Sequence, residues 1–461
     1  DYLYINNRDG TFSEELESYM RSISAASMGA DIADINNDGW MELFVTEMLP
    51  EHDARLKTVT TFENWENYQE KLKNGYYHQF TRNMLHLNNK DSTYSEIGRL
   101  AGVEATDWSW GALIADFDND GLRDIFVSNG ILRDLTNQDY LRYVSNPRTM
   151  RTIIRGKDVN FRQLIDTIPS NKVPNYIFQN QGELQFENRA EDWGVNQKTH
   201  SNGSAYGDLD NDGDLDLVVN NLNMQSAIYE NRASEMKPDH NWIQLNLVGS
   251  GDNIQAIGAQ VTLKHNNKIY FAEKVPARGF QSSVDPKVHI GLGNVDSVDT
   301  LMVDWPNGTQ TFLTNVEVNK LITLEQKNAS EETIPSKPSV GVNPLFSARQ
   351  ADELGLTFEH KENKFNEFKR HKLLFHMNST EGPPLCVGDL NNDGREDIFV
   401  GGAKGQQAVL FLQDEMGSFE KKQPDVFKLH EKSEDTDCAI FDADGDQKPD
   451  IYVTSGGIDY S

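Results

Sequence analysis

The chain has 461 residues, of which 37% are hydrophobic and 10% aromatic, so it is long enough for two or three folded domains and too apolar for a disordered acidic protein. Its 72 acidic and 43 basic residues give a formal net charge of -29. This excess of acid argues against nucleic-acid binding and against a simple electrostatic attachment to an anionic membrane, because both favour a basic face. The chain has no run of 18 or more apolar residues that would predict a membrane-spanning helix.

An acidic loop of nine residues first appears at residues 34–42 and occurs five times along the chain. Each copy reads Asp-x-Asp/Asn-x-Asp, then a spacer and a closing acid at the ninth position, and a β-rich run follows. The copies begin at Asp34, Asp116, Asp208, Asp389 and Asp442. A weaker strand–turn–strand pattern recurs between them. One unit is therefore four short antiparallel strands, and its repetition predicts the blades of a β-propeller.

Two insertions, at about 46–83 and 130–174, separate the first three copies and read as short amphipathic helices. The acidic loop joins the first and second strands of a unit, whereas the insertions join the second and third. We therefore expect the insertions on the face opposite the acidic loops. The first insertion is rich in aromatic residues, including Trp65, Tyr68, Tyr76 and Tyr77. We expect most of them to pack onto the blades and one or two to remain outside as part of a partner-binding surface.

Residues 241–327 interrupt the repeat with strand-like alternation and no acidic loop, which predicts a separate small all-β domain. Residues 328–344 are rich in Ser, Pro and Glu and read as a linker, and the acidic repeat resumes in 345–461. Cys386 and Cys438 each lie in an apolar stretch just before an acidic loop. We expect two buried free thiols there rather than a disulfide. Both chain ends lie close to strand-like segments, so we expect the chain to be part of a longer protein.

The acidic loops have the residue types that Ca²⁺ binds, because this cation takes six to eight oxygen ligands at about 2.3–2.6 Å. Side chains at positions one, three, five and nine and the carbonyl at position seven can supply them. Turn-forming chemistry explains Asp-Asn-Asp-Gly, but it does not explain a closing acid in every copy. We expect about five Ca²⁺ sites, with these ligand residues in chain order: Asp34, Asn36, Asp38, Trp40, Glu42; Asp116, Asp118, Asp120, Leu122, Asp124; Asp208, Asp210, Asp212, Asp214, Asp216; Asp389, Asn391, Asp393, Arg395, Asp397; Asp442, Asp444, Asp446, Lys448, Asp450.

The fifth copy departs most from the pattern. Gly445 stands at position four, Gln447 takes the turn position that is Gly in the other copies, and Pro449 precedes the closing Asp450. Its ligand residues are present, and its backbone geometry is the open question. Five Ca²⁺ ions would offset about a third of the net charge of -29, so we expect calcium to stabilise the fold rather than to take part in catalysis.

The acidic repeats resemble FG-GAP/VCBS propeller repeats. The segment 241–327 resembles an ASPIC/UnbV domain through "IGAQVTL", "RGFQSSVDPKVHIGLG" and "VDWPNGTQTFL". This combination is similar to the cartilage acidic protein family and, through the helical insertions, to its bacterial cell-surface members. The resemblance implies that 1–240 holds the later blades of a first propeller and 345–461 the first blades of a second. It also implies a secreted or lipid-anchored protein of the outer-membrane surface, beside a SusC/SusD-like transporter, whose membrane anchor lies outside this segment.

The sequence contains no P-loop, H-E-x-x-H, G-x-S-x-G or C-x-x-C motif. We therefore expect a non-enzymatic, calcium-stabilised scaffold that binds a protein partner or a glycan. One alternative is a propeller enzyme that acts on polysaccharide, with its site on the funnel or in segments outside this chain. Another is a purely structural subunit of an outer-membrane complex.

Overall fold

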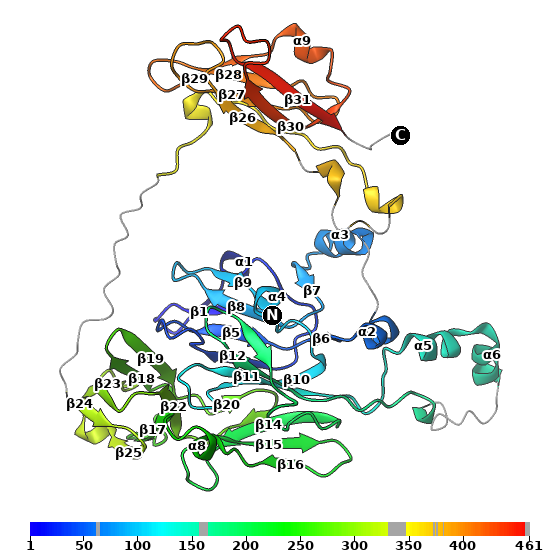
Figure 1. Ribbon diagram of the computed structural model, residues 1–461. Helices are drawn as coiled ribbons and strands as arrows, with labels where there is room; N and C mark the ends of the chain where they lie inside the picture. The colour runs from blue at the N-terminus through cyan, green and yellow to red at the C-terminus, as the bar shows by residue number, and fades with distance from the viewer. Residues whose placement is uncertain are drawn as a thin grey trace. The chain divides into compact units, whose positions relative to one another are not determined.

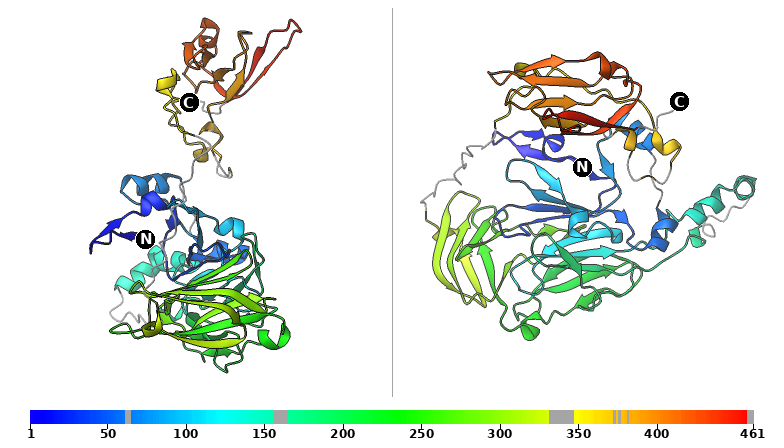
Figure 2. Two further views of the ribbon diagram at one scale, coloured as in Figure 1. Left: turned by 90° about the vertical axis from the view of Figure 1, so that its left-hand side faces the viewer. Right: turned by 45° about the horizontal axis from the view of Figure 1, so that its top comes forward.

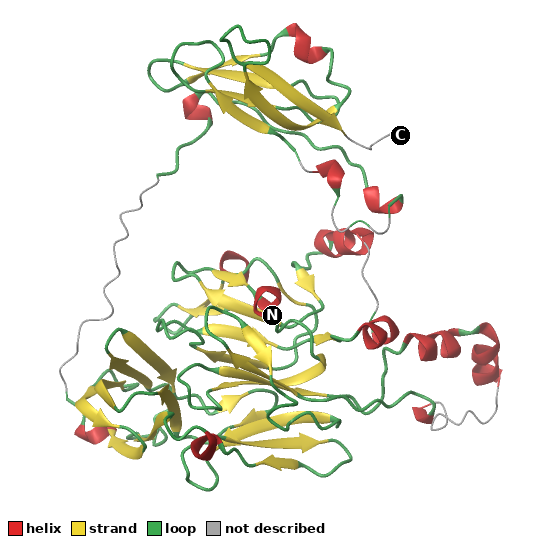
Figure 3. Cartoon of the chain, in the orientation of Figure 1, coloured by secondary structure: helices red, strands yellow, loops and turns green. Residues whose placement is uncertain are grey.

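The structure is a computed structural model that describes residues 1–60, 65–155, 165–330, 347–371, 374, 377–380 and 382–456. It consists mainly of β-strands with a few short helices (Figure 3), which confirms the predicted fold class. The chain divides into two compact units, 1–336 and 337–461 (Figure 1). Each unit has its own hydrophobic core. The predicted linker 328–344 spans this division, and its residues 331–344 lie outside the described residues.

The first blade is a four-stranded antiparallel sheet in the order β4-β5-β8-β9. Its strands are β4 (Ala30–Ala33), β5 (Glu42–Val45), β8 (Met84–Asn88) and β9 (Tyr94–Glu96). Alternation along β5 and β8 places Phe44 and Leu85 in a core shared with the second blade. The elements around it are β1 (Tyr4–Asn6), β2 (Phe12–Glu14), α1 (Leu16–Tyr19), β3 (Ile23–Ser24) and α4 (Gly98–Ala101).

The second blade contains β10 (Asp107–Ala115), β11 (Asp124–Asn129), β12 (Tyr176–Asn180) and β13 (Phe186–Asn188), and β6 (Met48–Leu49) pairs with the free edge of β10. The third blade contains β14 (Ser201–Gly207), β15 (Asp216–Asn221) and β16 (Ala227–Tyr229), and α8 (Ala233–Met236) follows it. All six residues of β11 are buried, because the second blade is packed between its neighbours. In all three blades the acidic loop joins the first strand to the second.

The first insertion follows β5 of the first blade, and the second follows β11 of the second blade. Each begins at the end of its strand that is farther from the acidic loop. The first carries β6, α2 (Asp53–Val59), α3 (Trp65–Lys73) and β7 (Gln79–Phe80), and the second carries α5 (Gln138–Ser145) and α6 (Pro147–Arg155). Figures 1 and 2 show α2, α5 and α6 on the side of the blades away from strands β17–β25. The Arg55 guanidinium of α2 donates bidentate hydrogen bonds of 2.7–3.1 Å to both Asp107 and Asp134, so one side chain ties the two insertions to β10.

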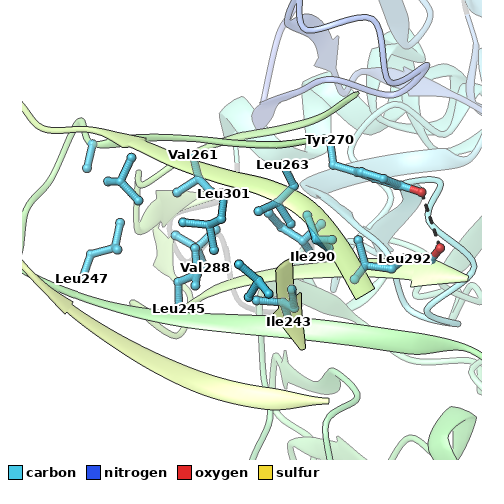
Figure 4. Close-up of a cluster of buried hydrophobic side chains, with 14 of the residues drawn as sticks. Ile243, Leu245, Leu247, Val261, Leu263, Tyr270, Val288, Ile290, Leu292 and Leu301 are labelled. Atoms are coloured by element: carbon cyan, nitrogen blue, oxygen red, sulfur yellow. Dashed lines mark hydrogen bonds between the residues drawn. The ribbon is translucent and has the colours of Figure 1, made fainter. Parts of the chain in front are cut away.

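Residues 241–330 form a β-module of two sheets, in the orders β22-β17-β25 and β19-β18-β23-β24. Its core between the sheets includes Ile243, Leu245, Val261, Leu263 and Ile290, all buried (Figure 4). Its elements are β17 (Asn241–Val248), β18 (Gln260–His265), β19 (Lys268–Glu273), β20 (Ala277–Arg278), β21 (Ser282–Ser283), β22 (Val288–Gly293), β23 (Ser297–Asp304), β24 (Gln310–Glu317), β25 (Lys320–Glu325) and the 3-10 helix η1 (Gln326–Asn328).

The short hairpin β20–β21 joins the module to the first strands of all three blades. Gly279 forms an antiparallel bridge with Ala30 of β4. The Phe280 ring lies 4.9 Å from that of Trp110 in β10, and β21 contacts β14. The module therefore has its own core and is also packed into the first unit through the inner edge of each blade.

The second unit contains a four-stranded antiparallel sheet in the order β26-β27-β28-β29 and the pair β30-β31. Phe358 packs on its core of Val400, Val409 and Phe411. Its elements are the 3-10 helices η2 (Asp352–Leu354), η3 (Glu367–Lys369) and η4 (Asn378–Thr380), the strands β26 (Leu385–Gly388), β27 (Asp397–Val400), β28 (Val409–Gln413), β29 (Phe419–Lys422), β30 (Glu434–Phe441) and β31 (Asp450–Gly456), and α9 (Asp425–Lys428).

The expectation of two free thiols is wrong, because Cys386 of β26 and Cys438 of β30 form a disulfide with an Sγ–Sγ distance of 2.00 Å. Both residues lie in the first strand of their repeat, just before its acidic loop. First strands of consecutive repeats are neighbours, and here the two Cα atoms are 6.0 Å apart, within the range that a disulfide spans. Cys386 stands three residues before Asp389 and Cys438 four residues before Asp442, and this similar placement in consecutive repeats was the sequence signal for the pairing.

Candidate metal centres

The five acidic loops share one backbone conformation, with left-handed residues at positions four and six. In the first four loops these are Asn and Gly, as in Asn119 (φ 57°) and Gly121 (φ 93°). In the fifth loop the order is exchanged, with Gly445 (φ 81°) at position four and Gln447 (φ 67°) at position six. Because Gly accepts a left-handed conformation freely and Asn tolerates it, the exchange moves the steric cost to Gln447. The fifth loop therefore keeps the geometry of the others.

Backbone N–H groups hold the loop carboxylates in a repeated pattern. In the second loop, the two Asp116 oxygens accept hydrogen bonds from the N–H groups of Asp120 (3.2 Å) and Gly121 (2.8 Å). The closing acid, Asp124, accepts from Phe117 N–H (3.1 Å) with one oxygen and from Asn180 N–H (2.9 Å) in the third strand with the other. The closing acid thus fixes the loop to the sheet. This explains why it recurs in every copy.

Three of the loops bring three carboxylates together, with one oxygen of each lying within 4.8 Å of the others. Over the described ranges, the two loops with Asn at position three, at Asp34 and Asp389, do not form such a trio. In the first of these, the Asn36 Oδ1 atom is buried without a hydrogen-bond partner. The three groups are Asp116, Asp118 and Asp124; Asp208, Asp210 and Asp212; and Asp442, Asp444 and Asp450.

The electrostatics of these loops fit a hard divalent cation. Burial, followed by repulsion from neighbouring carboxylates, raises the pKa of Asp116 and of Asp124 well above the usual range. Burial raises the pKa of Glu42 to about 7, and Asp34 and Asp38 add to the shift. In the third loop, the Oδ1 atoms of Asp208 and Asp214 are buried without a hydrogen-bond partner. Negative charge therefore remains in excess in these loops and two carboxylate oxygens of the third loop lack partners, and an oxygen-binding cation would supply what they lack.

Consecutive loops of the first unit are joined directly to one another. The Asn37 side chain of the first loop donates a hydrogen bond from Nδ2 to the carbonyl of Gly121 in the second (2.7 Å). The Asn119 side chain donates in the same way to the carbonyl of Gly213 in the third (3.0 Å). Position four therefore has two functions, a left-handed turn and a link to the next blade. Gly445 of the fifth loop can perform only the first.

Residues after the third blade also reach the loops, and the sequence analysis did not identify them. The Lys237 ammonium lies 2.6 Å from Asp118 Oδ2, and His240 Nδ1 lies 2.8 Å from the Asp118 carbonyl oxygen. Gln244 of β17 donates from Nε2 to Asp208 Oδ2 (2.7 Å). No local motif marks these three residues, because their role depends on how the module packs.

The aromatic residues of the first insertion are divided between packing and exposure. The Tyr68 ring lies 5.7 Å from Trp65 and 6.1 Å from Phe80, and the Tyr77 hydroxyl donates to the carbonyl of Met20 (2.8 Å). Tyr76 is 57% exposed. The structure therefore brings Trp65 and Tyr68 together, packs Tyr77 against the cluster of Leu16, Met20 and Ile23, and leaves Tyr76 at the surface.

Two family models match the chain. The model described as "ASPIC and UnbV" matches residues 249–331, and the FG-GAP-like repeat model matches 1–45 and 389–453. The residues matched by the FG-GAP-like repeat model include the first, fourth and fifth acidic loops. The second and third loops have the same backbone conformation as these three. No curated protein matches the chain. Among the residues that the structure describes, none of the helices has the length and hydropathy to cross a bilayer. The chain therefore combines FG-GAP-like repeats of a β-propeller with an ASPIC/UnbV domain.

Proposed function

We propose that this chain is a non-enzymatic cell-surface scaffold whose blades are stabilised by calcium and whose helical insertions bind a protein partner or a glycan. The observation that carries the calcium assignment is the second loop. There Asp116, Asp118 and Asp124 are at most 6% exposed and present oxygens within 4.8 Å of one another. Such a trio is stable at neutral pH only with a compensating cation or with protonation.

The loop side chains at positions one, three, five and nine would hold the ion, and the position-seven carbonyl would complete the set. Bound Ca²⁺ supplies positive charge and accepts several protein oxygens in an irregular shell. Mg²⁺ is a poorer candidate, because it retains most of its waters and demands octahedral geometry. The backbone N–H groups around each carboxylate orient it before the ion arrives. The loop is therefore pre-organised for binding.

The helical insertions support the assignment of a partner surface. They stand away from the acidic loops and carry exposed apolar side chains, namely Tyr76, Leu141, Tyr143 and Met150, at 41–57% exposure. The Arg55 clamp, with its two aspartates, fixes their base. Exposed apolar groups on a rigid support are typical of protein-binding surfaces. Location at the outer-membrane surface, beside a SusC/SusD-like transporter, follows from the family resemblance and is part of the same proposal.

Thermal unfolding with Ca²⁺ and with EDTA tests the calcium role. We expect each occupied site to contribute about 2–4 kcal/mol at saturating Ca²⁺, so the midpoint should fall clearly in EDTA and recover on adding Ca²⁺ but not Mg²⁺. An unchanged midpoint would overturn the calcium assignment. Purified protein incubated with polysaccharides should release no product, and turnover would favour the propeller-enzyme alternative. A pull-down from native membranes should recover a partner that is lost when Tyr76 and Tyr143 are changed to Ser.

A further inference from the structure

The β-module lies directly on the acidic loops of the second and third blades through β17 and β22. We propose that the module completes the metal sites of these two loops, so that calcium binding there and docking of the module stabilise each other. This inference rests on the proposed calcium role. It adds the statement that residues outside the repeats determine the calcium affinity of two of the loops.

A directed chain of hydrogen bonds connects the module to both loops. Asn119 donates from Nδ2 to the Gly213 carbonyl, so its Oδ1 accepts, and His289 Nε2 lies 2.7 Å from it. Burial lowers the pKa of His289 to about 3, so the ring is neutral and its Nε2–H donates. Its Nδ1 then accepts from Gln244 Nε2 (3.4 Å), which also donates to Asp208 Oδ2 (2.7 Å). Every donor and acceptor has one consistent role.

Two glycines show how closely the module is fitted to the loops. A Cβ atom on Gly291 of β22 would lie 2.0 Å from Asp116 Oδ2, and one on Gly213 of the third loop would lie 1.9 Å from the Trp242 ring of β17. The Gly293 N–H donates to the Asn119 carbonyl (2.9 Å). The first ligand of the second loop and the turn of the third are therefore held in place by the module.

The coupling follows from charge. Asp116, Asp118 and Asp124 of the second loop are buried, with β22 of the module against Asp116, and the Lys237 ammonium pairs with Asp118. Burial of the remaining carboxylates is costly without a metal ion. Conversely, groups that orient metal ligands through hydrogen bonds change metal affinity about 10–100-fold. If the metal favours docking, docking must favour the metal by the same factor.

The fourth loop is an internal control. Among the described residues, the hydrogen bonds to the Asp389 carboxylate come from backbone N–H groups of its own loop, at Asp393 (3.0 Å) and Gly394 (2.8 Å). It has the same left-handed turn, with Asn391 at position three, and it belongs to the second unit rather than to the unit of the module. Its calcium affinity should be independent of Gln244.

Hydrogen–deuterium exchange of the full chain during a Ca²⁺ titration tests the coupling loop by loop. In the wild type, adding Ca²⁺ to EDTA-treated protein should slow exchange in the acidic loops and also in β17 and β22. Gln244→Ala should weaken Ca²⁺ binding at the third loop about 10–100-fold and leave the fourth loop unchanged. Gln260→Ala, an exposed glutamine on β18 of the same module, is the matched control and should alter neither.

The outcomes separate this inference from the calcium role itself. If Ca²⁺ slows exchange in none of the loops, including the fourth, the proposed function fails. If the loops respond but β17 and β22 do not, the coupling is overturned and the calcium role stands. Equal affinities at the third loop in Gln244→Ala and Gln260→Ala would also overturn the coupling. The wild-type titration decides the question even if Gln244→Ala does not fold.

Discussion

The second and fifth acidic loops have the same backbone and opposite surroundings. In both, the first aspartate accepts hydrogen bonds from the residues at positions five and six, and the closing acid accepts from position two. Asp116, Asp118 and Asp124 are buried, whereas Asp442, Asp444 and Asp450 are exposed. The motif therefore specifies the shape of the loop, and the neighbouring elements specify its electrostatics. A shared motif need not mean a shared calcium affinity.

The largest difference in stability should appear between a buried ion pair and an exposed one. Arg278 of the module donates to Asp31 Oδ1 at 2.6 Å, with both side chains largely buried, and Arg278→Met leaves the carboxylate without a counter-charge. We expect a loss of about 3–5 kcal/mol in the free energy of unfolding, measured by denaturant titration of the first unit. The control is Arg395→Met, which removes a partly exposed pair with Asp393 and should cost the second unit about 1 kcal/mol or less in the same titration. Equal losses would contradict the distinction.

The pH dependence of stability should change sign with calcium. Burial raises the pKa of Glu42 and of Asp214 to about 7 in the metal-free protein. The folded state then binds more protons than the unfolded state below that pH, so in EDTA the first unit should become more stable as the pH falls from about 7 to about 5. With Ca²⁺ bound, protons compete with the ion and stability should fall over the same range. Denaturant midpoints that move in the same direction under both conditions would refute this prediction.

The link between consecutive loops predicts a smaller effect. Asn119→Ala removes the hydrogen bond to the Gly213 carbonyl and leaves His289 without its acceptor. Asn392→Ala in the fourth loop changes the same left-handed position (φ 59°, against 57° at Asn119), so the steric cost of Ala cancels in the comparison. We expect Asn119→Ala to cost about 1–3 kcal/mol more than Asn392→Ala. Thermal melts give the difference when each variant is compared with the wild-type melt of the unit that carries the substitution.

The smallest effect concerns the turn of the fifth loop. Gln447 has a left-handed φ of 67°, which is strained for a residue with a side chain. Gln447→Gly removes this strain, so it should leave the free energy of unfolding unchanged or raise it by up to about 1 kcal/mol. The reverse change in the covered loop, Gly121→Gln, should destabilise, because a Cβ there lies 3.3 Å from the Tyr270 ring. A lower midpoint for Gln447→Gly would contradict the steric cost assigned to Gln447, and an unchanged midpoint for Gly121→Gln would show that the covered turn tolerates a side chain.

The repeats made the blades predictable, whereas contacts between distant segments were not. Regular recurrence of the acidic loop and of strand alternation predicted the blade unit, the β-module and the insertions. Nothing local to Arg278 indicates Asp31, which precedes it by 247 residues, and nothing local to Gln244 indicates Asp208. The turn of the fifth loop was in doubt because Gly was expected at one position, whereas the backbone requires two left-handed residues in either order. The cysteines were misread because each was considered in its own stretch.

The hairpin β20–β21 has a consequence for how the protein is made. Asp31 leaves the ribosome 247 residues before its partner Arg278, and at about 5–20 residues per second this interval is roughly ten to fifty seconds. During that interval β4, and then β10 and β14 once they are made, lack the segment that joins them. The β-module therefore acts as the last component of its unit to be added during translation. A nascent chain that stalls before it would present three blades with an uncovered inner edge to chaperones and proteases.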